Sequence, residues 1–106
     1  MKIQILDAAE QDLVDGFNFY EIQSQGLGHY FLDSVYADME LLHLYYGIHP
    51  EHFGYHRLLT KRFPFAIYDR IEGKSIRIYA VLDCRKNPKS IHDRLGLIAS
   101  SSNSEK

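Results

Sequence analysis

The feature that most constrains the fold is a β-hairpin in the second half of the chain. Two segments rich in β-branched and aromatic residues, 65–71 and 75–83, flank the tetrapeptide Glu72-Gly73-Lys74-Ser75. A glycine in the first of two turn positions is typical of a type II′ turn, which joins neighbouring antiparallel strands. The sequence therefore predicts two paired strands with Gly73-Lys74 as their connection.

The two faces of this hairpin have different chemistry. With a two-residue turn, Arg70 lies opposite Arg77, and Tyr68 lies opposite Tyr79 on the same face. Asp69 shares the parity of the other face and is expected near the sheet edge or on a twist. That other face is expected to pack on helices and carries Phe65, Ile67, Ile71, Ile76, Ile78, Ala80 and Leu82.

The rest of the chain is predicted to form two helices before the hairpin and one short helix after it. Asp7 and Glu10 resemble a capping box, and Gly47 precedes Pro50 at the end of a helical pattern. The order β-α-α-β-β-β-α predicts an α+β domain of two layers. The predicted elements are a strand at 2–6, helices at 7–25 and 29–46, strands at 55–61, 65–71 and 75–83, and a helix at 88–95 after the N-cap Asn87.

Length and composition favour one intracellular domain. The 106 residues predict a single domain at 1–95, followed by a polar, flexible C-terminal tail at 96–106. Cys84 is the only cysteine, so no internal disulfide forms, and a buried structural thiol is expected. Neither a membrane span nor a secretory signal is expected, which predicts a cytoplasmic protein.

Charge is distributed unevenly along the chain. The formal net charge is −2, but residues 1–53 carry nine acids and one base, whereas residues 54–106 carry eleven bases and five acids. Such asymmetry is typical of a chain whose basic half meets an acidic partner. Neutralisation between the two halves within one fold explains it equally well, and both interpretations stay open here.

A group of histidines suggests a metal site. His49, His52 and His56 are closely spaced, with His43 nearby. Pro50 and the glycine at position 54 place them in a loop, and no cysteine accompanies them. The sequence favours a polar loop over a metal site, and no cofactor is expected.

Four short motifs carry a resemblance to a known family. They are His56-Arg57-Leu58, Phe63 to Arg70, Ile76 to Val81, and Arg85-Lys86-Asn87-Pro88. With the helical hairpin before them, they make residues 3–95 similar to the RelE/ParE superfamily of bacterial toxins from type II toxin–antitoxin systems. The resemblance implies a helical hairpin packed on a small twisted antiparallel sheet, and a cognate antitoxin that covers the working surface.

Two activities occur in this superfamily, and the resemblance implies different residues for each. RelE-like members cut mRNA on the ribosome without a metal, whereas ParE-like members of the plasmid stabilisation type inhibit DNA gyrase by binding. Phe65 stands where the nucleases carry an arginine, and the nearest acid or base is His92. Arg85 matches a basic position of the nucleases. The departures favour a ParE-like growth inhibitor over an endoribonuclease that uses Arg85 and His92, and a non-toxic, partner-binding member is a third alternative.

The basic hairpin face is the predicted binding surface for an antitoxin and for a target, DNA gyrase or the ribosome with its mRNA. Two facing arginines repel each other, so either an internal acid (Asp83 or the first helix) or an acidic partner must compensate them. A solvated face is the alternative. The candidate partner- and target-binding residues are Arg57, Lys61, Arg62, Tyr68, Arg70, Arg77, Tyr79, Arg85 and Lys86.

Overall fold

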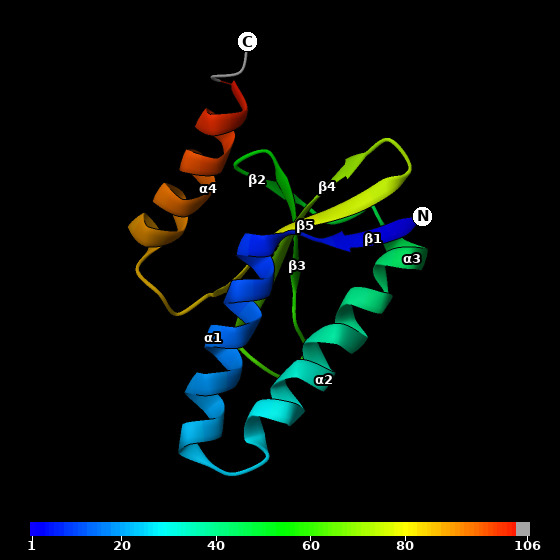
Figure 1. The fold of residues 1–106 in the computed structure, drawn as a ribbon. Helices are drawn as coiled ribbons and strands as arrows, with labels where there is room; N and C mark the ends of the chain where they lie inside the picture. Colours follow the sequence, from blue (N-terminus) through cyan, green and yellow to red (C-terminus); the bar gives the residue numbers. More distant parts are fainter. Residues whose placement is uncertain (104–106) are drawn as a thin grey trace.

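The computed structural model describes the backbone of residues 1–103 and the side chains of residues 1–96. Figure 1 shows α1 and α2 as a splayed pair below the sheet and α4 as a separate helix. No helix in the described part of the chain is long and apolar enough to cross a bilayer. The elements are β1 (Lys2–Ile5), α1 (Asp7–Gln23), α2 (Leu27–Glu40), α3 (Leu42–Tyr45), β2 (Glu51–His52), β3 (Tyr55–Leu59), β4 (Phe65–Glu72), β5 (Ser75–Asp83) and α4 (Pro88–Asn103).

The predicted α+β fold, a helical hairpin on a small sheet, is confirmed. The sheet has five strands in the order β1-β5-β4-β3-β2. Strands β3 to β5 pair antiparallel, as predicted, and the short β2, in a segment that was predicted to be a loop, pairs antiparallel with β3. Strand β1 pairs with β5 in parallel, so the sheet is mixed. A hairpin turn reverses the chain between neighbouring strands, whereas the crossover through α1 and α2 allows β1 to run in the same direction as β5.

Each face of the sheet has its own hydrophobic core. The larger core lies between the sheet and the α1–α2 hairpin, and includes Leu13, Phe31 and Ile67. On the opposite face, α4 covers the sheet and adds a third layer to the two that were predicted. This smaller core consists of Tyr55, Ala66, Tyr68, Ala80, Leu82 and Leu95.

An irregularity in the β4–β5 pair corrects the predicted faces. Tyr68 pairs with Ala80, so Tyr79 is an extra residue and the predicted Tyr68–Tyr79 pairing is wrong. A bulge of this kind shifts every later residue of the strand to the other face. Ala80 and Leu82 therefore pack under α4 instead of on α1 and α2, and Val81 joins the larger core.

The turn of the hairpin has the predicted geometry. The backbone angle φ is 62° at Gly73 and is not positive at Lys74, as a type II′ turn requires. Because the turn has two residues, Arg70 pairs directly with Arg77, as predicted.

N-terminal caps were predicted for both α1 and α4, and only the cap of α4 is confirmed. The N-cap of α1 is Leu6, which makes no side-chain hydrogen bond, so the predicted capping box of Asp7 and Glu10 is wrong. Asn87 caps α4 as predicted, because its Oδ1 accepts the Lys89 N–H at 2.8 Å.

The helix α4 continues to Asn103, beyond its predicted end at residue 95. Residues 96–103 of the expected tail are therefore helical, and residues 104–106 lie outside the described residues. A single glycine inside a helix costs about 1 kcal/mol relative to alanine. This cost is too small for Gly96 to end α4.

Candidate functional site

A pocket on the α4 side of the sheet gathers three of the predicted binding residues. Arg57 of β3 and Tyr68 of β4 are paired across the sheet, and Lys86 approaches from the loop before α4. The pocket has a volume of about 320 Å³ and no acidic residue in its lining. We call it the basic pocket; its lining residues are His52, Phe53, Arg57, Tyr68, Cys84, Lys86, Pro88 and Ile91.

The electrostatics of the basic pocket favour anions. Within the described part of the chain, neither Arg57 nor Lys86 forms an ion pair. Burial raises the pKa of the Tyr68 phenol, although the Arg57 guanidinium opposes that shift. The pocket therefore presents two cations beside a neutral phenol, an arrangement that binds carboxylates or phosphates.

Cys84 lies at the edge of this pocket. The residue is exposed, so the predicted buried position is wrong. Desolvation of its thiol within the pocket raises the pKa of the group, although the Arg57 guanidinium opposes that shift. The thiol is therefore protonated at neutral pH, which argues against a nucleophilic role.

Arg70 and Arg77 are held by internal partners rather than left free. The guanidinium carbon of Arg70 lies 4.1 Å from the centre of the Tyr55 ring, and its Nε donates to the Gly54 carbonyl at 3.1 Å. Arg77 pairs with Glu72, with 3.0 Å between Nη1 and Oε1. The internal acid at this pair is therefore Glu72, which binds Arg77, and not Asp83 or the first helix as predicted.

Tyr79 belongs to the same arrangement. Its hydroxyl donates to the Glu72 carboxylate, and both burial and this hydrogen bond raise the pKa of the phenol. Glu72 thus accepts from Tyr79 and pairs with Arg77 at once. The predicted binding residues Arg70, Arg77 and Tyr79 thus have internal partners and do not line the basic pocket.

Arg85 and His92 have no contact partner in common among the described residues. Arg85 forms an ion pair with Asp83, with 2.8 Å between Nη2 and Oδ2, and donates to the Tyr20 hydroxyl of α1 at 3.3 Å. The same pairing lowers the pKa of the Asp83 carboxyl. His92 packs edge-on against Phe53, with 5.0 Å between ring centres. Arg85 thus contacts α1, whereas His92 packs on Phe53, which lines the basic pocket.

The remaining predicted binding residues, Lys61 and Arg62, are exposed in the β3–β4 connection. The Lys61 backbone N–H donates to the Asp38 carboxylate at 3.0 Å, which fixes the loop on α2. Within the described chain neither side chain has an acidic partner. Neither residue lines the basic pocket.

Phe65 lies in the larger core. It is 6% exposed, and its ring centre lies 4.9 Å from that of Phe31. The position that the resemblance matches to a nuclease arginine therefore points at the α1–α2 hairpin and not into the basic pocket.

The histidine group is divided: His49 and His56 lie together, and His52 lies apart from them in the basic pocket. His56 Nδ1 is hydrogen bonded to the His49 carbonyl at 2.9 Å, whereas His52 lines the basic pocket. Among the described residues, no three side chains of His, Cys, Asp or Glu are grouped so that they could hold a metal ion.

The predicted position of Asp69 is wrong. Asp69 was expected near the sheet edge, but it is 0% exposed and neither carboxylate oxygen has a hydrogen-bond partner in the structure. Burial raises its pKa to about 6, although His56 opposite it in the sheet opposes that shift. The parity of Asp69 with the apolar face was the signal for this burial.

Comparisons with known proteins identify the fold. No protein-family model matches the chain, and no curated protein matches its sequence. Among solved structures, it is similar to a chain described as "Chromosomal ParDE TA system from P. aeruginosa", with a TM-score of 0.64 and 22% identity. The match covers 76% of this chain and 92% of the other. The fold expected from the sequence is confirmed, and this chain shares it with a chain of a ParDE system.

Proposed function

We propose that this chain is the toxin of a type II toxin–antitoxin system, a ParE-like growth inhibitor that is located in the cytoplasm. It acts by binding a target of the DNA gyrase class and is neutralised by a cognate antitoxin. The fold shared with a chain of a ParDE system supports this proposal. The observation that carries it is the basic pocket, where Arg57 and Lys86 converge without an acid in the lining.

The basic pocket also specifies the chemistry of the antitoxin segment that covers it. From a protein partner, two cations favour a carboxylate side chain. Phe53 and Ile91 line the same pocket and supply apolar area. The matching segment is acidic with one or two apolar anchors, and Lys61 and Arg62 contribute to the approach of such a segment by long-range attraction.

An mRNA endoribonuclease is a second candidate, because His52, Arg57 and Lys86 line one pocket. Metal-free RNA cleavage needs a base, an acid and cations for the phosphate. The pocket supplies the cations and an imidazole. Against this candidate, Phe65 is buried in the larger core, and Arg85 is paired with Asp83.

Expression of the chain without an antitoxin tests the proposal. We expect growth arrest with loss of plasmid supercoiling and with intact mRNA. Cleavage of mRNA at codon positions would replace the gyrase proposal with the nuclease. No growth defect at all would contradict both activities and leave a non-toxic binding protein.

A charge-reversed pair of variants tests the pocket itself. Arg57→Glu with Lys86→Glu is expected to abolish both growth arrest and antitoxin binding. Lys74→Glu is the matched control for Lys86→Glu alone, because each reverses one exposed lysine and Lys74 lies in the hairpin turn at the opposite end of β5. Retention of full activity by the double variant, with an unchanged circular dichroism spectrum, would contradict the assignment of the pocket.

A further inference from the structure

Cys84 lies in the basic pocket, but no step of the function proposed above uses its thiol. It is the only cysteine of the chain, and it is exposed. Arg57 and Lys86 line the same pocket. A small anion that binds these two cations therefore comes to lie beside a thiol that it can reach.

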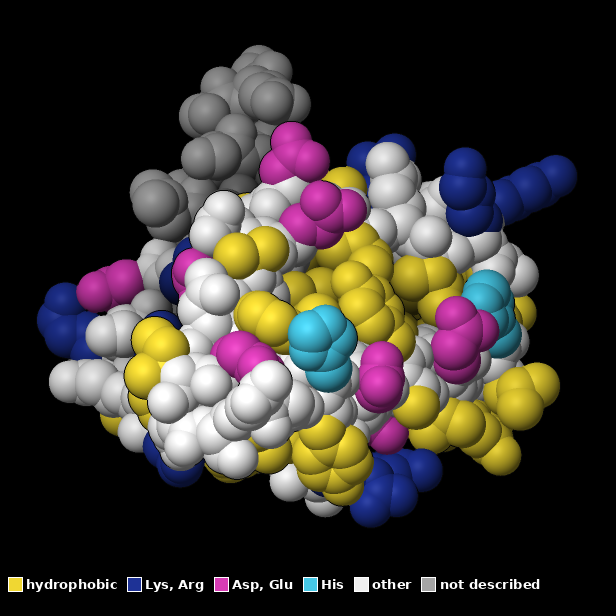
Figure 2. Space-filling view, turned by 60° about the horizontal axis from the view of Figure 1, so that its bottom comes forward, with side chains coloured by type: hydrophobic (Ala, Val, Ile, Leu, Met, Phe, Trp, Pro, Cys, Tyr) yellow, Lys and Arg dark blue, Asp and Glu magenta, His cyan; other side chains and the backbone are white. Residues whose placement is uncertain are grey.

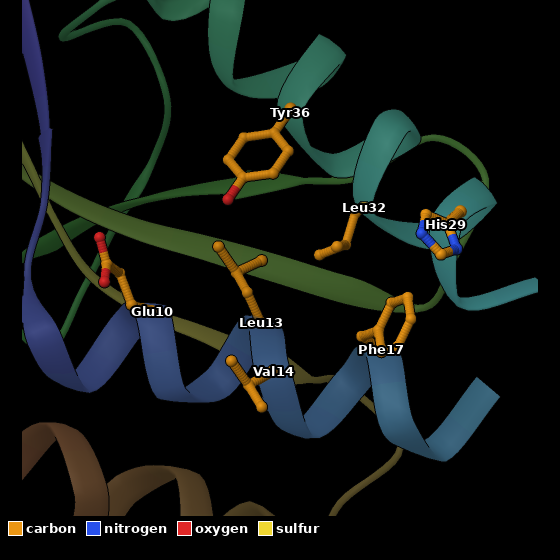
Figure 3. Close-up of a pocket in the computed structure, with 7 residues that line it drawn as sticks. All are labelled: Glu10, Leu13, Val14, Phe17, His29, Leu32 and Tyr36. Carbon is orange, nitrogen blue, oxygen red and sulfur yellow. The ribbon is translucent and has the colours of Figure 1, made fainter. Parts of the chain in front are cut away.

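Two other cavities have the opposite charge. Figure 3 shows the groove of about 490 Å³ between α1 and α2, with Glu10 at one end and Phe17 and His29 at the other. No lysine or arginine lines this groove, and on the side of the molecule in Figure 2 the dark-blue side chains lie at the outer edges. A cavity of about 280 Å³ beside the end of β5 has three aspartates and one lysine in its lining. A small anion is therefore attracted to the basic pocket rather than to these cavities.

Tyr68 supplies a hydrogen-bond donor that has no acceptor. The residue lines the basic pocket although it is only 4% exposed. In the described part of the chain its hydroxyl has no hydrogen-bond partner. Buried hydroxyl groups are normally hydrogen bonded, so this one indicates a ligand that brings an acceptor into the pocket.

The phenol, the thiol and the guanidinium of this pocket are close enough to act on one another. Burial raises the pKa of both the Tyr68 phenol and the Cys84 thiol, and in each case the Arg57 guanidinium opposes the shift. Asp83 raises the pKa of the neighbouring thiol, but its carboxylate is paired with Arg85. A ligand anion at Arg57 therefore lies beside both the thiol and the free donor.

We propose that the basic pocket is a modification site, in which Cys84 forms a mixed disulfide with a small thiol that carries carboxylates, such as glutathione. Arg57 and Lys86 bind the carboxylates, and Tyr68 donates a hydrogen bond to one of them. A glutathionyl group has two carboxylates, which match the two cations. The pocket volume of about 320 Å³ lies at the lower end of the range for small-molecule sites, about 300–1,000 Å³.

The reaction is a thiol–disulfide exchange, and its oxidant is the disulfide of the same small thiol. Cys84 loses its proton to water, and its sulfur attacks one sulfur of that disulfide. The new S–S bond forms as the S–S bond of the reagent breaks, and the released half leaves as a thiolate that takes up a proton. Cys84 is thereby oxidised and the released half is reduced, so no other co-reactant takes part.

The raised pKa of the Cys84 thiol slows the exchange in both directions. Burial raises this pKa, so only a small fraction of thiolate is present at neutral pH and the disulfide forms slowly. Once formed, the disulfide persists, because a thiol of high pKa is a poor leaving group when another thiol attacks. Cys84 is thus suited to a single, lasting modification and not to repeated turnover.

The consequence of this modification rests on the function proposed above. A glutathionyl group occupies the pocket and neutralises its cations with its own carboxylates. A target or an acidic antitoxin segment that needs Arg57 and Lys86 is then excluded. The modified chain is therefore an inactive toxin that a reductant restores.

Three small disulfides of different charge test the recognition. Glutathione disulfide is anionic, bis(2-hydroxyethyl) disulfide is neutral, and cystamine is cationic. Mass spectrometry of the intact chain measures the rate of adduct formation with each reagent, first on the folded chain and then on the chain unfolded in urea. Relative to the unfolded chain, we expect folding to favour glutathione disulfide over the neutral reagent by at least about tenfold and to disfavour cystamine. The same relative rates for all three reagents, or no glutathione adduct on the folded chain, would overturn the proposal.

Paired variants locate the recognition in the basic pocket. Arg57→Met with Lys86→Met is expected to lower the rate ratio of glutathione disulfide to the neutral reagent to that of the unfolded chain. The ratio cancels the effect of Arg57 on the thiol pKa. Lys61→Met with Arg62→Met is the matched control, because it removes the same two charges from exposed residues that do not line the pocket.

A milder variant guards against loss of the fold. Lys86 is exposed, so Lys86→Met alone is expected to fold and to lower the same rate ratio severalfold. A ratio that neither pocket variant changes would contradict the proposed role of the two cations.

Inhibition of DNA gyrase separates the modification from the function proposed above. A supercoiling assay compares the unmodified chain, the glutathione adduct, and the adduct after reduction with dithiothreitol. We expect the first and the third to inhibit and the adduct to be inactive, whereas equal inhibition by all three would overturn the regulatory consequence. A chain that inhibits in no form but shows the glutathione preference loses only the function proposed above. An inhibitory chain without the preference loses only the modification site.

Discussion

Arg94 of α4 binds Asp12 of α1 through two parallel hydrogen bonds, Nη1 to Oδ1 and Nη2 to Oδ2, both 2.9 Å long. The same carboxylate accepts the Val81 N–H of β5 at 2.9 Å. The parallel pairing of β1 with β5 ends at Ile5 and Ile78, so the N–H of Val81 lies beyond the last paired residue. Asp12 therefore joins two helices to the uncovered edge of the sheet.

Replacing Arg94 with methionine is expected to destabilise the protein by about 1–3 kcal/mol, because a half-buried carboxylate loses its cation. Amide hydrogen exchange in α4 should accelerate more than in α2, since the variant releases α4 from α1. Lys89→Met is the control: it breaks an exposed pair with Asp93 and should change stability by less than about 0.5 kcal/mol. Equal losses of stability in the two variants would show that the bidentate pair stabilises the protein no more than an exposed ion pair.

Replacing Glu72 with glutamine should make the stability of the hairpin depend on salt. The variant leaves Arg70 and Arg77 facing each other without the acid that pairs with Arg77, and Tyr79 loses its charged acceptor. We expect a loss of about 1 kcal/mol at low ionic strength that shrinks as salt screens the repulsion. Urea unfolding at two salt concentrations measures it. A loss that is the same at both concentrations would mean that the arginines do not repel each other appreciably.

Two glycine-to-alanine variants are expected to act in opposite directions. A Cβ atom on Gly16 would lie 2.6 Å from two ring carbons of Phe31, so Gly16→Ala should destabilise the α1–α2 contact by about 1–3 kcal/mol. Nothing lies within 4 Å of a Cβ on Gly96, so Gly96→Ala should stabilise α4 by up to about 1 kcal/mol. Thermal unfolding followed by circular dichroism compares them. A stable Gly16→Ala protein would contradict the close helix contact.

The buried Asp69 predicts an unusual pH dependence. Its pKa rises from 3.8 to about 6 on folding, so the folded protein binds the proton more tightly than the unfolded chain. Stability from this group is therefore full below about pH 3.8 and is lost as the pH rises to about 6, a loss on the order of 3 kcal/mol. Asp69→Asn cannot ionise, so the stability of the variant relative to the natural protein should increase between pH 4 and pH 7.

The control for Asp69 is a carboxylate with the opposite shift. Asp83 has a lowered pKa because it pairs with Arg85, so Asp83→Asn should lose stability near neutral pH rather than gain it. Urea unfolding at pH 4 and pH 7 measures the stability of both variants relative to the natural protein. A difference between Asp69→Asn and the natural protein that does not change with pH would mean that Asp69 is hydrated in solution.

Local patterns predicted those parts of the fold that depend on neighbouring residues. The type II′ turn at Gly73 and the cap at Asn87 follow from backbone preferences of single residues, and both are confirmed. The bulge beside Tyr68 has no such pattern, because either alternation of β5 places apolar residues on a covered face. Without α4 over the second face, the sequence offered no reason to expect a buried Tyr68.

The candidate site was predicted in part for the same reason. Arg57, Tyr68 and Lys86 were among the predicted binding residues and line one pocket, whereas Arg70 and Arg77 are engaged with Tyr55 and Glu72. Which arginines have internal partners depends on contacts between strands. The pair of Arg94 with Asp12 depends on two helices that are distant in the chain and share no periodic pattern.

The parallel pairing of β1 with β5 has a consequence for synthesis. Ile3 leaves the ribosome early, but its partner Ile76 is added only after both helices of the hairpin and three further strands. Until then the apolar side of the α1–α2 hairpin has no sheet to cover it, and such exposed surface promotes aggregation of nascent chains. The basic pocket is completed later still, when Lys86 and Ile91 follow. The nascent chain therefore lacks the basic pocket for most of its translation.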